Sequence, residues 1–447
     1  MKPYVDFLFI YEVKNRELEN ICLLRYELES RGYSVAFIGI WENIGKCKLR
    51  IDAGVVVSAA LYNDETYRSL ANYCGKFSKV INLQWEQIGT VSDKSNALSI
   101  LHISGIPQKA VHIAWGNITY ERLISCGLFD RNIRVLGHVG MDFLDKKMQS
   151  YYMTKEELFS RYNIPFDKKV CLFISSFTTT EAQENENTGK EGMTEYIEKY
   201  TSLDVNEFIL SHTESKKRIL EWVETLLCER DDIIFIYRPH PAEYISVEFQ
   251  TLFSSVRNCY IISELSVKQW IIACDVITMW YSTSLAEVFF AGKTCHILRP
   301  VEIPIDMELE LYEDAEFITN YNSFKTIFSS DSYRFPVRES VIREYFTQNE
   351  KLNYLGICDI FEEVLKDNTY TIPKPPRKPL SIIVKEKLIT TRLMKIIAKT
   401  LGSRIKYFDI LNRKHYENTY FSQMKDRNAT TGFEIDSIMN KIKKCFQ

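Results

Sequence analysis

Residues 233–244 read IIFIYRPHPAEY and decide the fold of this chain. Ile233 to Tyr237 form an apolar, β-favouring run, which predicts a buried strand of a parallel sheet. The run ends abruptly in Arg238-Pro239-His240-Pro241. Open α/β sheets bind ligands beyond the carboxyl ends of their strands, so an Arg and a His here favour an anion site that the two prolines keep rigid. The alternative is a surface connection whose Arg and His pair only with local carboxylates.

Length and composition predict a globular protein of two domains. A chain of 447 residues exceeds what one hydrophobic core usually supports. The formal net charge of −3 gives no indication of a nucleic-acid partner. The eleven cysteines form no CxxC pair, so we expect reduced thiols in a cytoplasmic protein. No window reaches the roughly 20 apolar residues of a transmembrane helix, and the first apolar run is followed too soon by charges to be a signal peptide.

Strands and helices alternate in two cycles. The first cycle opens with a predicted strand at 5–11 and an amphipathic helix at 16–31 that Gly32 closes. The second opens with a strand at 170–175 and continues through a helix at 211–229, capped by Ser211 or Thr213, to the strand at 233–237. This pattern predicts an α/β protein with two Rossmann-like domains facing a cleft.

Three ranges follow from this pattern. We expect an N-terminal Rossmann-like acceptor domain in residues 1–165 and a C-terminal Rossmann-like nucleotide-donor domain in residues 166–370. Residues 371–447 are expected to form a Pro-rich linker and a basic helical tail. The segment 374–414 is rich in Lys and Arg, with Glu386 and Asp409 as its only acidic residues. It predicts a basic amphipathic helix that lies on an anionic inner membrane, or else a solvated helix packed on its own protein.

A second polar cluster follows the predicted strand at 276–280. Ser282, Thr283 and Ser284 stand where this strand passes into a helix, so hydroxyls and backbone N–H groups converge there. Together with Arg238 and His240 they predict a phosphate site. Glu287, one turn further on, is placed to accept hydrogen bonds from a ribose or sugar hydroxyl. An N-cap and a solvated Glu are the structural alternatives.

Ser175 and Ser176, at the end of the strand at 170–175, are further candidates for nucleotide binding. The chain has no GxxxxGK[ST] loop and no GxGxxG motif, which argues against an NTPase or a dinucleotide enzyme. It also lacks a DxD-type carboxylate pair between strands, so we expect no bridging metal and no cofactor.

The candidate catalytic carboxylates lie in the N-terminal half. Glu86 directly follows a predicted strand, where a transferase needs a base or, if it retains configuration, a nucleophile. Asp142 is the second candidate, and Glu12, Arg16 and Glu17 are expected to bind the acceptor. The alternative for Glu86 is a buried carboxylate paired with a neighbour such as His112 or Arg134.

The motifs also resemble a known family. RPHP after a strand, followed by DVITMWYSTSLAEVFFAGK at 275–293, resembles the HP and Ser/Thr motifs of bacterial GT-B glycosyltransferases. The pattern is similar to CMP-sugar-dependent Kdo transferases and sialyltransferases and to the CDP-glycerol glycerophosphotransferases. YEVKNRELENICLLRYELESRGYSV at 11–35 and INLQWEQ at 81–87 resemble surface carbohydrate biosynthesis proteins. The resemblance covers residues 4–300 and leaves out the tail.

This resemblance implies that His240, Ser282, Thr283 and Ser284 hold the nucleotide phosphate without a metal. We therefore expect a cytoplasmic, metal-independent glycosyltransferase that moves a sugar from a cytidine-nucleotide donor to a cell-surface polysaccharide or lipid-linked glycan, with Arg238 and His240 stabilising the leaving phosphate. Three alternatives stay open: a CDP-polyol phosphotransferase, a nucleotide-sugar 2-epimerase, and a non-catalytic scaffold of a glycan-assembly complex docked through the basic tail.

Overall fold

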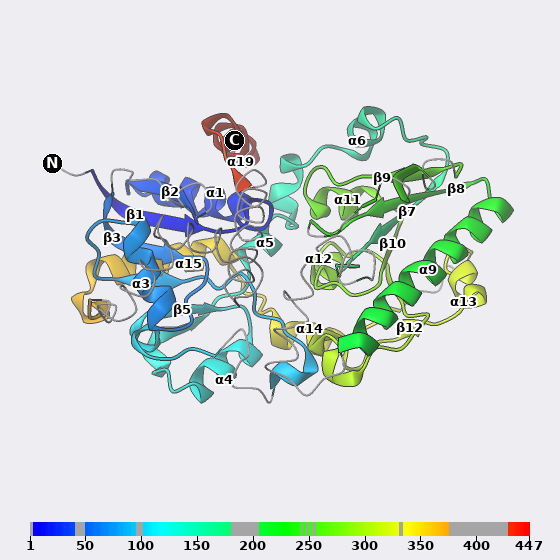
Figure 1. The fold of residues 1–447 in the computed structure, drawn as a ribbon. Helices are drawn as coiled ribbons and strands as arrows, with labels where there is room; N and C mark the ends of the chain where they lie inside the picture. Colours follow the sequence, from blue (N-terminus) through cyan, green and yellow to red (C-terminus); the bar gives the residue numbers. More distant parts are fainter. Residues whose placement is uncertain are drawn as a thin grey trace, which may run out of the picture.

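The computed structural model contains two parallel sheets of six strands that lie side by side (Figure 1). The residues it describes are 3–40, 50–94, 102–178, 180, 205–241, 243, 245, 246, 249–251, 253, 256–329, 334–374 and 428–447. The basic segment 374–414 lies outside these residues except for Lys374, so its helix and its membrane contact stay predictions. Within the described ranges no helix is long and apolar enough to cross a bilayer.

The first sheet is built from the first cycle of strands. Its order is β2 (Val35–Gly39), β1 (Tyr4–Tyr11), β3 (Asp52–Ser58), β4 (Val80–Asn82), β5 (Val111–Ala114) and β6 (Ile133–Val135), all parallel. Its main helices are α1 (Lys14–Ser30), α3 (Asp64–Tyr73), α4 (Asn117–Ser125) and the short α5 (Val139–Asp142). Most buried residues of these strands are apolar, as expected for a sheet covered by helices, with Asn82 of β4 and His112 of β5 among the buried polar exceptions. Gly32, with a φ of 90°, ends α1 as predicted.

The second sheet is built from the second cycle. Its order is β12 (Phe317–Ile318), β11 (Cys295–Leu298), β10 (Val276–Met279), β7 (Lys169–Ile174), β8 (Ile233–Arg238) and β9 (Cys259–Ile261). All pairs are parallel, and Ile174 of β7 is in register with Arg238 of β8. The strand order reverses between β7 and β10, which makes their carboxyl ends the topological switch point. The predicted α/β fold of two Rossmann-like domains is confirmed.

The helices of the second sheet correct one prediction. They are α9 (Val205–Glu229), α11 (Val267–Ala273), α12 (Leu285–Phe290), α13 (Tyr321–Thr326) and α14 (Glu339–Tyr345), and α6 (Lys155–Arg161) precedes β7. The predicted start of α9 at Ser211 is wrong, because the helix already includes Val205. The Ser211 hydroxyl donates to the Phe208 carbonyl (2.8 Å) inside the helix, so it is not a cap.

Two helices from late in the sequence pack on the first sheet. The apolar side of α15 (Asn353–Lys366) joins the same core as β1 and α1, and α19 (Gly432–Cys445) adds Met439 and Ile442 to that core. In Figure 1 α15 is drawn between β1 and β5, and α19 lies at the top of the view, above α1. The three predicted domain ranges stay predictions. The core of the first sheet nevertheless draws on residues that come after the second cycle.

The carboxyl edges of the two sheets meet. Ile88 follows β4, Trp115 follows β5, and Met141 lies in α5 just beyond β6. These three side chains belong to one apolar cluster with Leu285 and Ala286 of α12, the helix that follows β10. The ends of the strands, where α/β sheets bind ligands, therefore face the contact between the two domains.

Candidate functional site

A charged cluster lies at the carboxyl edge of the first sheet. Arg16 of α1 forms ion pairs with Glu17 (2.7 Å) and with Glu86, which follows β4. The Glu17 side chain is fully buried, and it accepts the backbone N–H groups of Glu12 (2.8 Å) and Val13 (3.1 Å). Burial raises the pKa of Glu17, and the Arg16 guanidinium opposes that shift. The structure thus brings together four predicted site residues, Glu12, Arg16, Glu17 and Glu86.

Glu86 keeps half of its side chain exposed, at 53%. The alternative partners expected for it are wrong. The His112 ring contacts the Asn82 side chain (3.2 Å) and the Pro107 carbonyl (2.8 Å), and Arg134 donates to Glu363 (3.1 Å). Glu86 is therefore a carboxylate of this edge that solvent and a ligand can reach.

Asp142 has a different environment. Its two carboxylate oxygens accept the backbone N–H groups of Asn353 (2.9 Å) and Tyr354 (2.7 Å), the first residues of α15. Its side chain is buried, and burial raises its pKa to about 7 while these two hydrogen bonds oppose the shift. The geometry assigns Asp142 to the N-terminus of a helix, so its predicted catalytic role has no support from the contacts around it.

Glu243 holds the RPHP loop at the carboxyl edge of the second sheet. This buried carboxylate accepts hydrogen bonds from Ser175 (2.6 Å) and Tyr237 (2.5 Å), forms an ion pair with Lys216 of α9 (2.9 Å), and accepts the backbone N–H of His240 (3.2 Å). The backbone N–H of Glu243 donates back to the His240 carbonyl (2.8 Å). The loop is therefore ordered before any ligand binds. Ser175 is almost wholly buried in this network, whereas Ser176, next along the chain, is 9% exposed.

His240 and Arg238 differ in their surroundings. The His240 residue is exposed, yet partial burial of its imidazole lowers the pKa, and the Glu243 carboxylate opposes this shift. The Arg238 guanidinium donates to the carbonyls of Glu264 (2.9 Å) and Leu265 (2.5 Å). Burial lowers the pKa of Arg238 to about 10. Arg238 thus stabilises the segment before α11. Its remaining N–H groups are candidates for binding an anion.

The predicted Ser/Thr turn joins β10 to α12. Tyr312 fixes this turn, since its hydroxyl accepts the Ser282 N–H (2.9 Å) and donates to the Ser282 carbonyl (2.7 Å). The Ser284 N–H donates to the Ser282 hydroxyl (3.2 Å), and Thr283 is exposed. Burial raises the pKa of Glu287, and the Lys268 ammonium opposes the shift. The turn is rigid, and it lies beside β7 at the switch point.

The sequence analysis missed four residues of these edges: Lys216, Lys268, Tyr312 and His138. Three of them stand inside helices or a loop, with no local pattern to mark them. His138 stands three residues after β6, and a position just beyond a strand is the same signal that identified Glu86. Nowhere in the described ranges do three or more His, Cys, Asp or Glu side chains lie together as a metal site requires. Metal independence stays a prediction.

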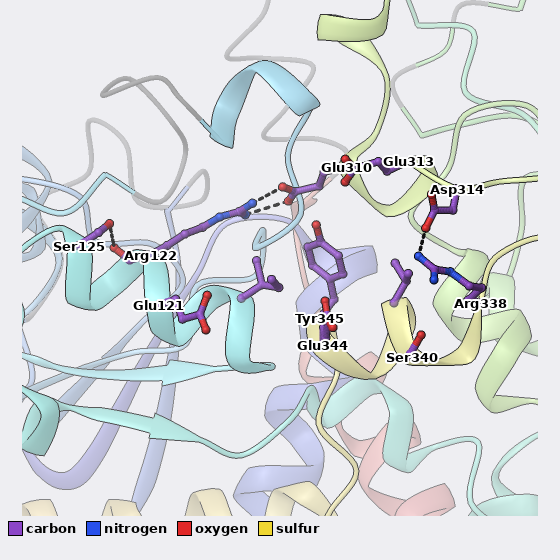
Figure 2. Close-up of a pocket in the computed structure, with 12 residues that line it drawn as sticks. Glu121, Arg122, Ser125, Glu310, Glu313, Asp314, Arg338, Ser340, Glu344 and Tyr345 are labelled. Atoms are coloured by element: carbon purple, nitrogen blue, oxygen red, sulfur yellow. Dashed lines mark hydrogen bonds and ion pairs between the residues drawn. The ribbon is translucent and has the colours of Figure 1, made fainter.

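A pocket of about 710 Å³ lies between α4 and α14 (Figure 2). Arg122 of α4 pairs across the domains with Glu310 (2.8 Å for one N–O contact), which also accepts the Gly89 N–H (2.8 Å). Five carboxylates and two arginines line the pocket, and none of the predicted site residues does. This excess of negative charge disfavours a phosphate. The two strand-end clusters therefore remain the candidate site.

Comparison with known proteins shows which solved structures have a similar fold. No family model and no curated protein matches this chain. Solved structures do match, among them several of the wall teichoic acid polymerase TagF. A variant with a histidine replaced by alanine matches over 81% of this chain and 89% of that chain, with 13% identity and a TM-score of 0.52. A variant soaked with CDPG matches over 80% and 88%, with 14% identity and a TM-score of 0.51.

This chain has the GT-B fold. The predicted fold family is thus confirmed, and at these identities the likeness concerns the fold alone. A complex of S. aureus MnaA with UDP also matches, over 84% of this chain and 100% of that chain, at 12% identity and a TM-score of 0.48.

Proposed function

We propose that this GT-B chain transfers a sugar from a nucleotide donor, with cytidine as its base, to a glycan acceptor. One observation supports this proposal above the others. A rigid loop with His240 and a Ser/Thr turn stand at the carboxyl edge of the second sheet, and the Arg16–Glu86 pair stands at the carboxyl edge of the first. A donor held by one edge and an acceptor held by the other meet between the domains.

The donor phosphate binds at the switch point of the second sheet. His240 donates an imidazole N–H to a phosphate oxygen, and the hydroxyls of Ser282, Thr283 and Ser284 donate from the neighbouring turn. The Glu243 network keeps the first loop in place and Tyr312 keeps the second, so little reorganisation accompanies the charge that develops on the leaving phosphate. CDPG in a TagF structure supports a cytidine nucleotide. No metal or cofactor is part of this proposal.

The acceptor binds at the first sheet. Its hydroxyl donates to Glu86, the exposed carboxylate of that edge, while Arg16 fixes the carboxylate through their ion pair. Glu12 and Glu17 position Arg16, because the buried Glu17 anchors both the guanidinium and the backbone at Glu12.

Thermal stability in the presence of CMP, CDP, UDP, GDP and TDP tests the donor site. We expect a cytidine nucleotide at about 100 times its Kd to stabilise the folded protein by about 2.7 kcal/mol. His240→Ala should weaken that binding about tenfold, which is the loss of one phosphate contact worth about 1.4 kcal/mol. His102→Ala, an exposed histidine of the first domain, is the matched control and should bind like the wild type. If no nucleotide raises the melting temperature, the proposal is wrong.

Polyol-phosphate transfer is the second candidate, and the TagF likeness favours it. It uses the same nucleotide site with a CDP-polyol donor. Mass spectrometry of the product separates sugar transfer from polyol-phosphate transfer, since polyol-phosphate transfer leaves a phosphodiester in the acceptor.

Two further outcomes would identify other functions. Turnover of a UDP-sugar without any acceptor would identify an epimerase. If removal of the residues after Pro373 abolishes function while His240→Ala leaves function unchanged, the protein is a scaffold.

A further inference from the structure

A buried segment of the second domain lies between the two strand-end clusters. Residues 307–312 stand between β11 and β12, and each of them is at most 6% exposed. Only short helical turns occur in this part of the chain, so most of its backbone polar groups need partners elsewhere. These partners belong to both candidate sites. We call residues 307–312 the strap.

Both ends of the strap hold the start of the Ser/Thr turn. The Tyr312 hydroxyl accepts the Ser282 N–H (2.9 Å) and donates to the Ser282 carbonyl (2.7 Å), so it binds both backbone polar groups of that residue. The Met307 carbonyl accepts the Tyr281 hydroxyl (2.8 Å). The turn proposed to bind the donor phosphate is therefore fixed from the strap.

Arg299 adds an ionic connection to the same turn. Its guanidinium forms an ion pair with Glu308 of the strap (2.7 Å) and donates to the carbonyl of Trp280 (3.2 Å), at the end of β10. Arg299 and Glu308 are only 4% and 6% exposed. A buried pair that also binds a backbone carbonyl keeps its geometry, because moving either charge would leave the other without its partner.

The middle of the strap pairs with the first domain through an antiparallel β-bridge. The Val91 N–H donates to the Glu308 carbonyl (2.9 Å), and the Glu310 N–H donates to the Gly89 carbonyl (3.2 Å). The Glu310 carboxylate accepts the Gly89 N–H (2.8 Å) and the Arg122 guanidinium (2.8 Å for one N–O contact), and Figure 2 shows this ion pair. The backbone of one domain thus binds the backbone of the other.

Gly89 stands three residues after Glu86, and the chain between them is fixed. The Gln87 side chain is 1% exposed, and its oxygen accepts the Trp115 N–H (2.8 Å) beyond β5. Gln84, with a left-handed φ of 45°, donates its side-chain amide to the Glu86 carbonyl (3.1 Å). The backbone that carries the Glu86 carboxylate therefore moves little relative to Gly89.

We propose that the strap sets the distance between the donor phosphate and Glu86, with Tyr312 as a positioning residue. This inference rests on the proposed function. Hydrogen bonds connect the two sites at each step, from Ser282 through Tyr312 and the strap to Gly89. Tyr312 is 1% exposed, so it acts through Ser282 and not by contact with a ligand. An error of about 1 Å between reacting groups can lower a rate about a hundredfold, so this distance matters for transfer.

Amide hydrogen exchange tests the connection, with CDP as the probe. Openings of the strap that also release the Ser/Thr turn become up to about 100-fold rarer when CDP is present at about 100 times its Kd. We expect CDP, bound to the second domain, to slow exchange of the Gly89 and Val91 amides in the first domain at least about threefold. Mass spectrometry of a peptide that covers residues 86–94 measures the exchange, and titration calorimetry measures the Kd.

Two variants interrupt the connection from opposite ends. Tyr312→Phe removes the hydroxyl that holds Ser282, so CDP should bind about tenfold more weakly, and CDP at saturation should no longer slow exchange at Gly89. Val91→Pro removes the N–H that donates to Glu308 and leaves the donor site intact. It should bind CDP within about twofold of the wild type and also lose the slowing at Gly89.

Tyr67→Phe is the matched control. Tyr67 is 1% exposed, and its hydroxyl donates to the Pro373 carbonyl (2.6 Å), away from the strap. This variant loses a buried hydroxyl bond of the same kind, yet CDP should slow exchange at Gly89 and Val91 as in the wild type.

The outcomes separate the two proposals. If no nucleotide binds the wild type, the proposed function fails and the positioning role fails with it. If CDP binds and leaves exchange at Gly89 and Val91 unchanged, the positioning role alone is overturned. Slowing that persists in Val91→Pro would overturn it as well, and this variant decides the question if Tyr312→Phe does not fold.

Discussion

Asp142 illustrates how burial and hydrogen bonding act against each other on one carboxylate. Burial raises its pKa to about 7 in the folded protein, against about 3.9 in an unfolded chain. Between these values the folded state binds the extra proton. The free energy of unfolding should therefore fall as pH rises from about 4 to about 7, by up to about 1.4 kcal/mol per pH unit. Asp142→Asn should remove this slope, because an amide does not titrate.

Urea unfolding at pH 5 and pH 8 measures this effect. Asp167→Asn is the control, since Asp167 is exposed and is not among the groups that act on Asp142. It should keep the pH dependence of the wild type. An equal pH dependence in wild type and Asp142→Asn would show that another group causes it.

Residue roles could be predicted from the sequence only where position on a strand determines them. Arg16, Glu17 and Glu86 follow strand ends, and the parallel sheet brings them together as expected. Arg238 ends a strand, but its partners are the carbonyls of Glu264 and Leu265, and Leu265 has a left-handed φ of 64°. Asp142 meets the start of a helix more than two hundred residues away. Neither contact has a local pattern, because both depend on how distant segments pack.

At the scale of elements, α19 is held by a small apolar contact. Ile442 is fully buried and Met439 is 7% exposed, while Phe446 stacks on Tyr26 of α1 with ring centroids 5.2 Å apart. Ile442→Ala should lower the free energy of unfolding by about 2–4 kcal/mol, through lost apolar burial and the cavity that remains. Phe433→Ala, on the same helix and 83% exposed, should change it by less than about 0.5 kcal/mol.

Guanidinium unfolding gives both values, and limited proteolysis shows whether α19 detaches first. Faster cleavage of the Ile442→Ala chain at its C-terminal end is the expected pattern. Equal effects of the two substitutions would mean that α19 does not pack on α1 in solution.

Periodicity predicted most elements of the fold but not their partners. The strand at 233–237 and the helix at 354–366 both exist, close to their predicted bounds. The sequence pattern of α15 shows one apolar side, yet nothing in that pattern says that it packs on the first sheet and not on the second. The early start of α9 was missed although Asp204 and Glu207 have the spacing of a capping box in the sequence.

At the scale of the whole molecule, the GT-B fold follows from strand order and not from sequence identity. The structure of TagF has a similar fold at only 13% identity, with a TM-score of 0.52. Buried parallel strands tolerate many apolar substitutions as long as volume and pattern persist. The pair of Arg122 and Glu310 joins the domains through charge, and its contribution to stability can be tested.

The Glu310 side chain is fully buried, and its polar partners include Arg122 and the Gly89 N–H, both from the first domain. Arg122→Met should leave this carboxylate buried without its cation and lower the free energy of unfolding by about 3–5 kcal/mol. Arg338→Met removes a guanidinium from the same pocket. The side chains of its pair with Asp314 are 62% and 45% exposed, so the free energy of unfolding should fall by less than about 1 kcal/mol.

Denaturant unfolding measures the stability of these variants, and small-angle scattering measures the arrangement of their domains. Because Glu310 joins the domains, Arg122→Met should also broaden the transition, as the two domains begin to unfold separately. A single sharp transition with wild-type scattering would show that the apolar contact around Trp115 and Leu285 is enough to hold the domains together.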